Sequence, residues 1–378
     1  MRICYLADGR YVHTHKLLRY FSEHGHEMHL LSFAPMDTGH VLAVERTGAR
    51  YHGELEQFHV KRWWRTLANV SALKKFLRAE QIDILHCHFL GRNAWFGALS
   101  GFHPFIVTVM GGDVTGPEWQ PGGDIRERYL TPLALRRADL ITCWSKNLTA
   151  VIKRFARPGV PVEVIHGGVD LERFSPGPKP EYLRAQMKLP ANAKVILSPR
   201  LMRPLYNLDV LARAAQKVCA KCADAYFVFA VLPEAKDTAY EARVRDIVAS
   251  DEQTRERVRF IGAIPHNEMA DHFRLADVTV SIPSTDGTPM SVLESMACET
   301  PVIVGRIPDY DREYIEPDVT ALAVATDNAD ELAAAILRIL SDDELFTSLA
   351  VEARVRVTTN GSYEAQMSRL ERLYAQLT

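Results

Sequence analysis

Short, uninterrupted apolar runs alternate with segments of helical periodicity through most of the chain. In the first half we expect strands at 2–7, 27–33, 82–89, 105–110, 139–144 and 162–168. Because these runs are continuous instead of alternating with polar residues, both faces of each strand would be covered, as in a parallel sheet. Their alternation with helices predicts βαβ units.

The pattern changes at residues 167–193, which are rich in proline and polar residues and have no sheet period. We expect an interdomain connection there. A second series of strands is expected at 194–199, 226–232, 257–264, 278–283, 301–305 and 321–325. The fold class predicted is therefore α/β, with two doubly wound, Rossmann-like domains. In such sheets ligands bind beyond the carboxyl ends of the strands.

The stretch STDGTPMSVLESMACETPV (284–302) carries the clearest chemistry. It leaves the end of a buried strand, with Thr288 placed to cap a helix and Pro289 at the first helical position. The amino end of such a helix favours phosphate, and Gly287 lets the backbone approach a ligand. Glu294, in the second turn, suits paired sugar hydroxyls, and Asp286 would reach a different group beyond the phosphates.

This spacing fits a nucleotide sugar, which has hydroxyls, then phosphates, then further hydroxyls. A second interpretation stays open on spacing alone. Asp286 could be an ordinary loop residue, and Glu294 could pair with a neighbouring arginine. The stretch contains neither a P-loop nor a G-x-G-x-x-G pattern.

Composition adds few constraints on function. The chain has 378 residues, 47% hydrophobic and 24% charged, with a formal net charge of −2. No strong field would attract nucleic acid. The six cysteines are scattered in apolar runs, which fits a reducing compartment better than a disulfide framework. No signal peptide or membrane-spanning run is seen, so we expect a cytoplasmic protein.

The segment 61–78 holds six basic residues, two tryptophans and no acid. As a helix it would be basic and amphipathic, which favours an anionic membrane surface or acceptor. The residues that would form this membrane patch are Lys61, Arg62, Trp63, Trp64 and Arg65. The alternative is a solvated helix with its tryptophans in the core, but two adjacent tryptophans cannot both point inward.

Several motifs together resemble the retaining glycosyltransferases of family 4, which have the GT-B fold. PSTDGTPMSVLESMACETPVIV is similar to that family's E-x7-E segment, and GGVDLERFSP (167–176) to its interdomain segment. SPRLMRPLYNLDVLARAA (198–215) resembles the diphosphate-binding loop and helix. The resemblance spans essentially the whole chain. It implies an N-terminal acceptor-side domain (1–170), a C-terminal nucleotide-sugar domain (171–360) and a last helix (361–378) packing back on the first.

The resemblance also implies roles for individual residues. Glu294 matches the glutamate that holds the ribose, Asp286 stands at the one that contacts the donor sugar, and Arg200 matches the arginine that binds the diphosphate. The donor would further meet Gly287, Thr288, Met290, Ser291, Ile264 at the base, and Gly9. The acceptor side would include Arg10, His88, Met110 and Asp113, the last as a partner for a substrate hydroxyl.

Three positions depart from the family pattern. Leu205 stands where a phosphate-binding lysine is common, and Arg203 or Arg200 would have to supply the charge. Met110 stands where a histidine is common on the N-terminal active-site strand. Gly167 replaces the asparagine of the interdomain segment.

The expected function is transfer of a hexosyl group, with retention, from a nucleotide sugar to a glycan, lipid-linked or small-molecule acceptor. A UDP-sugar is favoured as donor and GDP-mannose comes second. The resemblance implies that no metal or other cofactor is needed, and no nucleic acid partner is expected. Two alternatives remain open: a nucleotide-sugar-binding protein without turnover, motivated by Leu205 and Met110, and a sugar-nucleotide epimerase of the same architecture.

Overall fold

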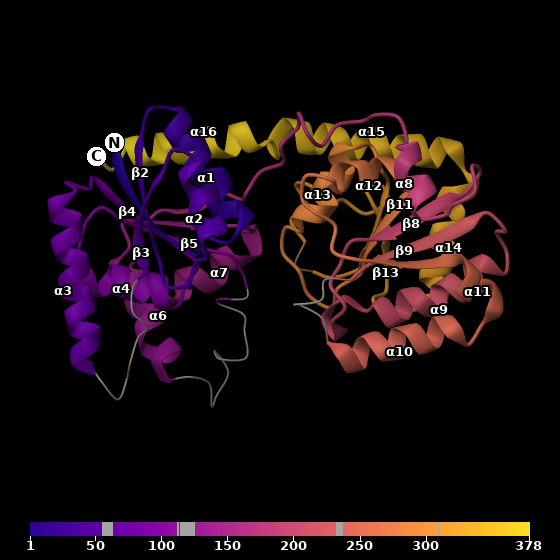
Figure 1. The fold of residues 1–378 in the computed structure, drawn as a ribbon, viewed down its shortest axis with the longest axis horizontal. Helices are drawn as coiled ribbons and strands as arrows, with labels where there is room; N and C mark the ends of the chain where they lie inside the picture. Colours follow the sequence, from indigo (N-terminus) through magenta and orange to yellow (C-terminus); the bar gives the residue numbers. More distant parts are fainter. Residues whose placement is uncertain (55–62, 112, 114–124, 232–236, 309) are drawn as a thin grey trace. The chain divides into compact units, whose positions relative to one another are not determined.

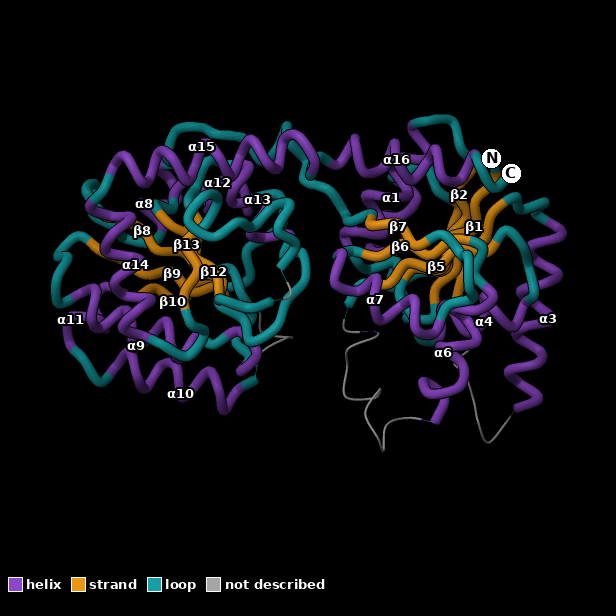
Figure 2. The backbone as a smooth tube through the Cα atoms, turned by 180° about the vertical axis from the view of Figure 1, so that it is seen from behind, coloured by secondary structure: helices purple, strands orange, loops and turns teal. Residues whose placement is uncertain are grey.

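The computed structural model describes all residues except 55–62, 112, 114–124, 232–236 and 309. The chain divides into two compact units (Figure 1). Unit 1 consists of residues 1–167 together with 364–378, and unit 2 of residues 168–363. Each unit is an α/β layer structure in which helices enclose a parallel sheet, as Figure 2 shows for each unit separately.

Unit 1 holds a seven-stranded parallel sheet in the order β3-β2-β1-β4-β5-β6-β7. Its strands are β1 (Arg2–Leu6), β2 (Glu27–Ser32), β3 (Arg50–Glu54), β4 (Ile84–His88), β5 (Phe105–Val109), β6 (Leu140–Cys143) and β7 (Val162–Val164). The order turns back between β1 and β4, which is the switch point of a doubly wound sheet. The loops after β1 and β4 therefore lie side by side at the carboxyl edge.

The helices of unit 1 are α1 (Val12–Glu23), α2 (Thr38–Glu45), α3 (Trp63–Ala79), α4 (Arg92–Ser100), α6 (Ile125–Arg137), α7 (Lys146–Phe155) and α16 (Tyr363–Ala375). One large core packs α3, α4, α6 and α7 against the sheet. On the other side α16 runs beside α1, where the ring of Tyr374 stacks on Phe21 at 5.0 Å. The last helix of the chain thus packs in unit 1, with the first sheet.

Unit 2 holds a six-stranded parallel sheet in the order β10-β9-β8-β11-β12-β13. Its strands are β8 (Lys194–Ser198), β9 (Ala225–Ala230), β10 (Val258–Ile261), β11 (Val278–Ser281), β12 (Val302–Gly305) and β13 (Leu322–Val324). The helices are α8 (Glu181–Gln186), α9 (Leu208–Cys219), α10 (Thr238–Ala249), α11 (Glu252–Arg257), α12 (Met269–Leu275), α13 (Met290–Ala297), α14 (Ala329–Ser341) and α15 (Asp343–Asn360). Two separate hydrophobic cores fill the two faces of this sheet.

The predicted fold class is confirmed: both sheets are parallel, and their central strands are buried on both faces. Two elements were not predicted. β3 lacks an apolar run, because RYHGE pairs through its backbone at the sheet edge and needs little side-chain burial. The short helix α8 lies inside the proline-rich connection, where it is held by the buried side chains of Leu183 and Arg184.

Candidate functional site

In unit 2 the loops after β8 and β11 bring two of the predicted site residues together. These strands are neighbours in the sheet, so their carboxyl ends adjoin. A guanidinium nitrogen of Arg200, Nη2, donates to Oδ2 of Asp286, and both side chains are largely buried. Arg200 Nη1 also lies 3.3 Å from the hydroxyl of Ser291, and its guanidinium stacks over the Tyr206 ring at 4.4 Å. Asp286, not Glu294, is therefore the carboxylate that pairs with an arginine.

Several polar atoms around this ion pair are buried without a hydrogen-bond partner in the described part of the chain. They are Arg200 Nε, Thr288 Oγ1 and the Tyr310 hydroxyl. A buried polar group without a partner costs about 1–3 kcal/mol. Such groups collect where a polar ligand completes the bonding, so this cluster fits a site for an oxygen-rich anion.

Glu294 lies in the second turn of α13 and is only 6% exposed. Its Oε1 is 3.3 Å from Nε2 of His266, in the loop after β10. The other ring nitrogen of His266, Nδ1, lies 3.1 Å from Nη1 of Arg173. Because an arginine can only donate, Nδ1 accepts, and Nε2–H is the donor to Glu294. This bond holds the loop that carries Ile264 close to Glu294.

The start of α13 differs from the expectation. Pro289, not Thr288, is the N-cap residue, and no side chain caps the helix. The prediction placed the helix start one residue too early, because Thr288 and Pro289 match the usual residue preferences at N-cap and first helical position. Because no side chain caps α13, its first N–H groups are left for an anion, which favours phosphate binding at this helix end.

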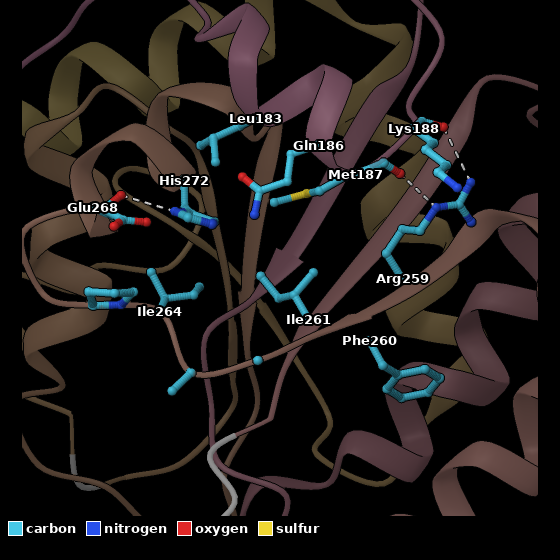
Figure 3. A pocket seen from close by; sticks show the side chains of 13 residues that line it. Leu183, Gln186, Met187, Lys188, Arg259, Phe260, Ile261, Ile264, Glu268 and His272 are labelled. Atoms are coloured by element: carbon cyan, nitrogen blue, oxygen red, sulfur yellow. Dashed lines mark hydrogen bonds between the residues drawn. The ribbon is translucent and has the colours of Figure 1, made fainter.

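A pocket of about 390 Å³ lies between the end of β10, α8 and α12 (Figure 3). Its wall includes Ile264, Gln186 and His272. The Nδ1 atom of His272 donates to the Glu268 carbonyl at 3.0 Å, which leaves Nε2 as an acceptor. Burial lowers the pKa of His272, so the ring stays neutral near pH 7. The pocket therefore presents a neutral imidazole beside both apolar side chains, such as Ile261, and charged ones, such as Arg259.

Leu205 lies in a short turn, Pro204–Tyr206, and its side chain is 41% exposed. The carbonyl of Leu205 accepts from the Ser284 amide at 2.8 Å, so this turn is fastened to the loop that carries Asp286. Arg203 is exposed at the start of the turn. The neighbouring Tyr206 is not among the predicted site residues, yet its ring lies against the Arg200 guanidinium.

In unit 1 the loop after β1 carries Gly9 and Arg10. The guanidinium of Arg10 donates to both oxygens of Asp8, at 2.9 and 2.7 Å. Burial raises the pKa of Asp8, but the hydrogen bonds and charge of Arg10 outweigh it and leave that pKa below its ordinary value. A Cβ on Gly9 would lie 2.5 Å from Sδ of Met36, so packing alone accounts for a glycine here.

Asp113 is buried, and its carboxylate accepts hydrogen bonds from three backbone amides. The donors are the N–H groups of Leu90 at 3.0 Å, Met110 at 3.1 Å and Gly111 at 2.7 Å. These bonds use most of the acceptor capacity of a carboxylate. Asp113 therefore fastens the loop after β5 to the loop after β4. The structure gives it a positioning role, and its predicted contact with a substrate hydroxyl stays a prediction.

His88 ends β4 and lies between two partners. The Tyr5 hydroxyl contacts its Nδ1, and its Nε2 is 2.8 Å from the sulfur of Met110. Burial lowers the pKa of His88 to about 4. Because a thioether sulfur can only accept, the neutral ring carries its proton on Nε2, and Nδ1 accepts from the Tyr5 hydroxyl. Met110 and His88 thus lie together, and the next residue, Phe89, is 45% exposed with a φ of +75°.

The remaining predicted features are described only in part. Lys61 and Arg62 lie outside the described residues, as do the side chains of Trp63 and Trp64, whereas Arg65 is exposed on α3. Within the described ranges, no helix is long and apolar enough to cross a membrane. Nor do the described histidine, cysteine and acidic side chains include a group of three that could hold a metal ion.

Comparisons with known proteins identify the family of this chain. The family model described as Glycosyltransferase Family 4 matches residues 8–173, and that described as Glycosyl transferases group 1 matches residues 181–356. A D-inositol 3-phosphate glycosyltransferase of Kineococcus radiotolerans is 26% identical over 296 residues, which cover 72% of this chain and 67% of the relative. The corresponding protein of Thermobispora bispora is 28% identical over 230 residues, or 60% of this chain and 53% of the relative. The chain thus matches about half to two thirds of the length of these relatives.

Solved structures with low sequence identity share the fold. Sucrose-phosphate synthase of Thermosynechococcus elongatus superposes with a TM-score of 0.76 at 21% identity, covering 100% of this chain and 99% of that one. HepE of Anabaena, solved in complex with UDP-glucose, gives a TM-score of 0.80 at 16% identity, and both chains are covered completely. The family models account for both units and these structures account for the whole fold: the chain belongs to glycosyltransferase family 4 and has the GT-B fold.

Proposed function

We propose that the protein transfers a glycosyl group from a nucleotide sugar to an acceptor hydroxyl, with retention and without a metal ion. The observation that carries the proposal is the buried, unpartnered Nε of Arg200 beside the uncapped start of α13. Arg200 donates from Nη2 to the Asp286 carboxylate and from Nη1 to the Ser291 hydroxyl. Its Nε–H is a buried donor with no acceptor, and a diphosphate oxygen would supply one.

The chemical demand of this reaction is negative charge that builds on the leaving diphosphate. Arg200 and the amino end of α13 are placed to stabilise that charge, because both present fixed positive groups in a largely buried site. In the proposed same-face attack, the leaving phosphate takes the proton of the acceptor hydroxyl. No protein nucleophile is then required, and Asp286 orients the donor sugar.

The ribose would be held by Glu294, whose second oxygen is not engaged by His266. The base would lie over the loop that contains Ile264, beside the pocket of Figure 3. A UDP-sugar is the first donor to test, and GDP-mannose the second. HepE, a fold relative, has been solved with UDP and with UDP-glucose, which supports this order.

The acceptor would meet the loops of unit 1 that carry Arg10, His88 and Met110. Curated relatives are named D-inositol 3-phosphate glycosyltransferases, so a phosphorylated cyclic polyol belongs in an acceptor screen with glycans and lipid-linked sugars. Membrane association through residues 61–65 also stays a prediction. Flotation with liposomes, with and without anionic lipid, would test it.

The experiment for the donor site is calorimetric titration with UDP, GDP and ADP, in EDTA, on wild type and on Arg200→Ala. We expect one diphosphate to bind in the micromolar range and the variant to lose about a hundredfold in affinity or in turnover. Transfer with retention would then be read from the anomeric configuration of the product. Failure of all three diphosphates to bind would contradict the proposed donor site, whereas binding without transfer would favour the alternative of a nucleotide-sugar-binding protein.

A further inference from the structure

Tyr310 follows β12, and its buried O–H group lacks a hydrogen-bond acceptor in the described part of the free protein. The residue is 7% exposed, and its ring packs in the core that also contains Tyr314 and Ile315. The O–H group has no hydrogen-bond acceptor within the described part of the chain, since the one backbone group near it, the Gly305 amide, can only donate. Because an orphaned buried hydroxyl is destabilising, phenylalanine would fill the same space at lower cost. The hydroxyl therefore needs a reason that lies outside the stability of the free protein.

The sheet order brings the loop that carries Tyr310 to the same edge of the sheet as the Arg200–Asp286 ion pair. β8, β11 and β12 are consecutive neighbours, so the loops that carry Arg200, Asp286 and Tyr310 leave adjoining strand ends. Burial raises the pKa of Tyr310, Asp286 raises it further, and Arg200 acts in the opposite direction. The phenol thus lies within electrostatic range of both charges and remains an O–H donor across the working pH range.

The ion pair itself creates a difficulty for anion binding. Oδ2 of Asp286 holds Arg200, while Oδ1 accepts from the Gly287 amide at 2.9 Å. A diphosphate that takes the guanidinium competes with Oδ2 for the same donors. A carboxylate oxygen released in a buried site would be left without a partner, which is costly. An unused O–H donor nearby would remove that cost.

We propose that Tyr310 is a positioning residue that receives the carboxylate of Asp286 when a diphosphate binds Arg200. This inference rests on the proposed function. The hydroxyl that is unpartnered in the free protein then donates to Asp286 in the complex. Asp286 turns away from the guanidinium without losing its hydrogen bonding, and it is held where it can orient the donor sugar.

The test is a double-mutant cycle between Tyr310→Phe and Asp286→Asn, read in two ways. Thermal unfolding without ligand should show that Tyr310→Phe is as stable as wild type or slightly more stable. Titration with UDP should show about a tenfold loss of affinity for Tyr310→Phe. In the Asp286→Asn background the same change should cost less than about twofold, because the charged acceptor is gone.

Tyr314→Phe is the matched control, four residues away in the same core. Its hydroxyl donates to the Asn360 carbonyl at 3.1 Å, so its loss should lower the melting temperature and leave UDP affinity unchanged. Equal UDP affinity of Tyr310→Phe and wild type would overturn the inference while the proposed function stands. So would an undiminished effect of Tyr310→Phe in the Asp286→Asn background. Wild type that binds no diphosphate would remove both proposals together.

Discussion

The carboxylate of Glu294 lies 3.3 Å from Nε2 of His266, and the two residues come from different strand-to-helix connections. Glu294 is in α13, whereas His266 follows β10 at the far edge of the same sheet. This single contact joins the carboxylate expected at the ribose to the loop expected at the base. The two ends of the proposed nucleoside site are therefore positioned by one hydrogen bond.

Glu294→Ala should lose at least about a hundredfold in affinity for the diphosphate that wild type prefers, because a bidentate acceptor for hydroxyls disappears. Calorimetric titration measures this. Glu241→Ala is the control: Glu241 is 7% exposed and paired with Arg245 in α10. It should cost comparable stability and leave affinity intact. Equal affinities in Glu294→Ala and wild type would refute the ribose assignment.

Leu205→Lys should strengthen diphosphate binding three- to tenfold and make it more dependent on salt. The Leu205 side chain is 41% exposed, so a lysine fits without repacking, and a flexible ammonium group there reaches toward bound phosphate. Titration with UDP at two ionic strengths checks the prediction. No gain at low salt would mean that the phosphates lie out of reach of this turn.

Asp113→Asn should destabilise unit 1 by about 2 kcal/mol, because an amide presents one acceptor oxygen to three backbone donors. The melting temperature should fall, and transfer should weaken mainly through a higher KM for the acceptor. An unchanged melting temperature combined with lost kcat would instead support direct contact between Asp113 and a substrate hydroxyl.

Acid should destabilise the protein through His88. Its pKa is about 4 in the folded state and ordinarily about 6.5, so the unfolded chain binds a proton that the folded chain excludes. The stabilising effect is full above pH 6.5 and is lost as pH falls from 6.5 to 4, by about 3 kcal/mol in total. In His88→Gln the unfolding free energy should fall less steeply between pH 6.5 and 4, because unfolding then takes up about one proton fewer. An unchanged slope would contradict the assignment.

The sequence was sufficient for the sheets, because strands buried on both faces leave continuous apolar runs such as those at 194–199 and 278–283. It also located the loop and helix that carry Asp286 and Glu294, which are close in the chain. The Arg200–Asp286 ion pair could not be predicted from the sequence, since its two residues are 86 positions apart and meet only because β8 lies beside β11. His266 and Tyr310 were missed for the same reason, because the strand order brings their loops to the loop and helix that carry Asp286 and Glu294. Tyr206 lies only six residues from Arg200, but its stacking on the guanidinium depends on the conformation of the turn between them.

The position of α16 in the chain determines when unit 1 can complete its folding. Tyr374 is fully buried, stacks on Phe21 and hydrogen-bonds through its hydroxyl to His86 in β4. These contacts join α16 to α1 and β4, so no stretch that stops at 167 contains the whole core of unit 1. During synthesis, unit 2 can finish folding while unit 1 still waits for its last helix to leave the ribosome. The sheet that is translated first is thus the one completed last.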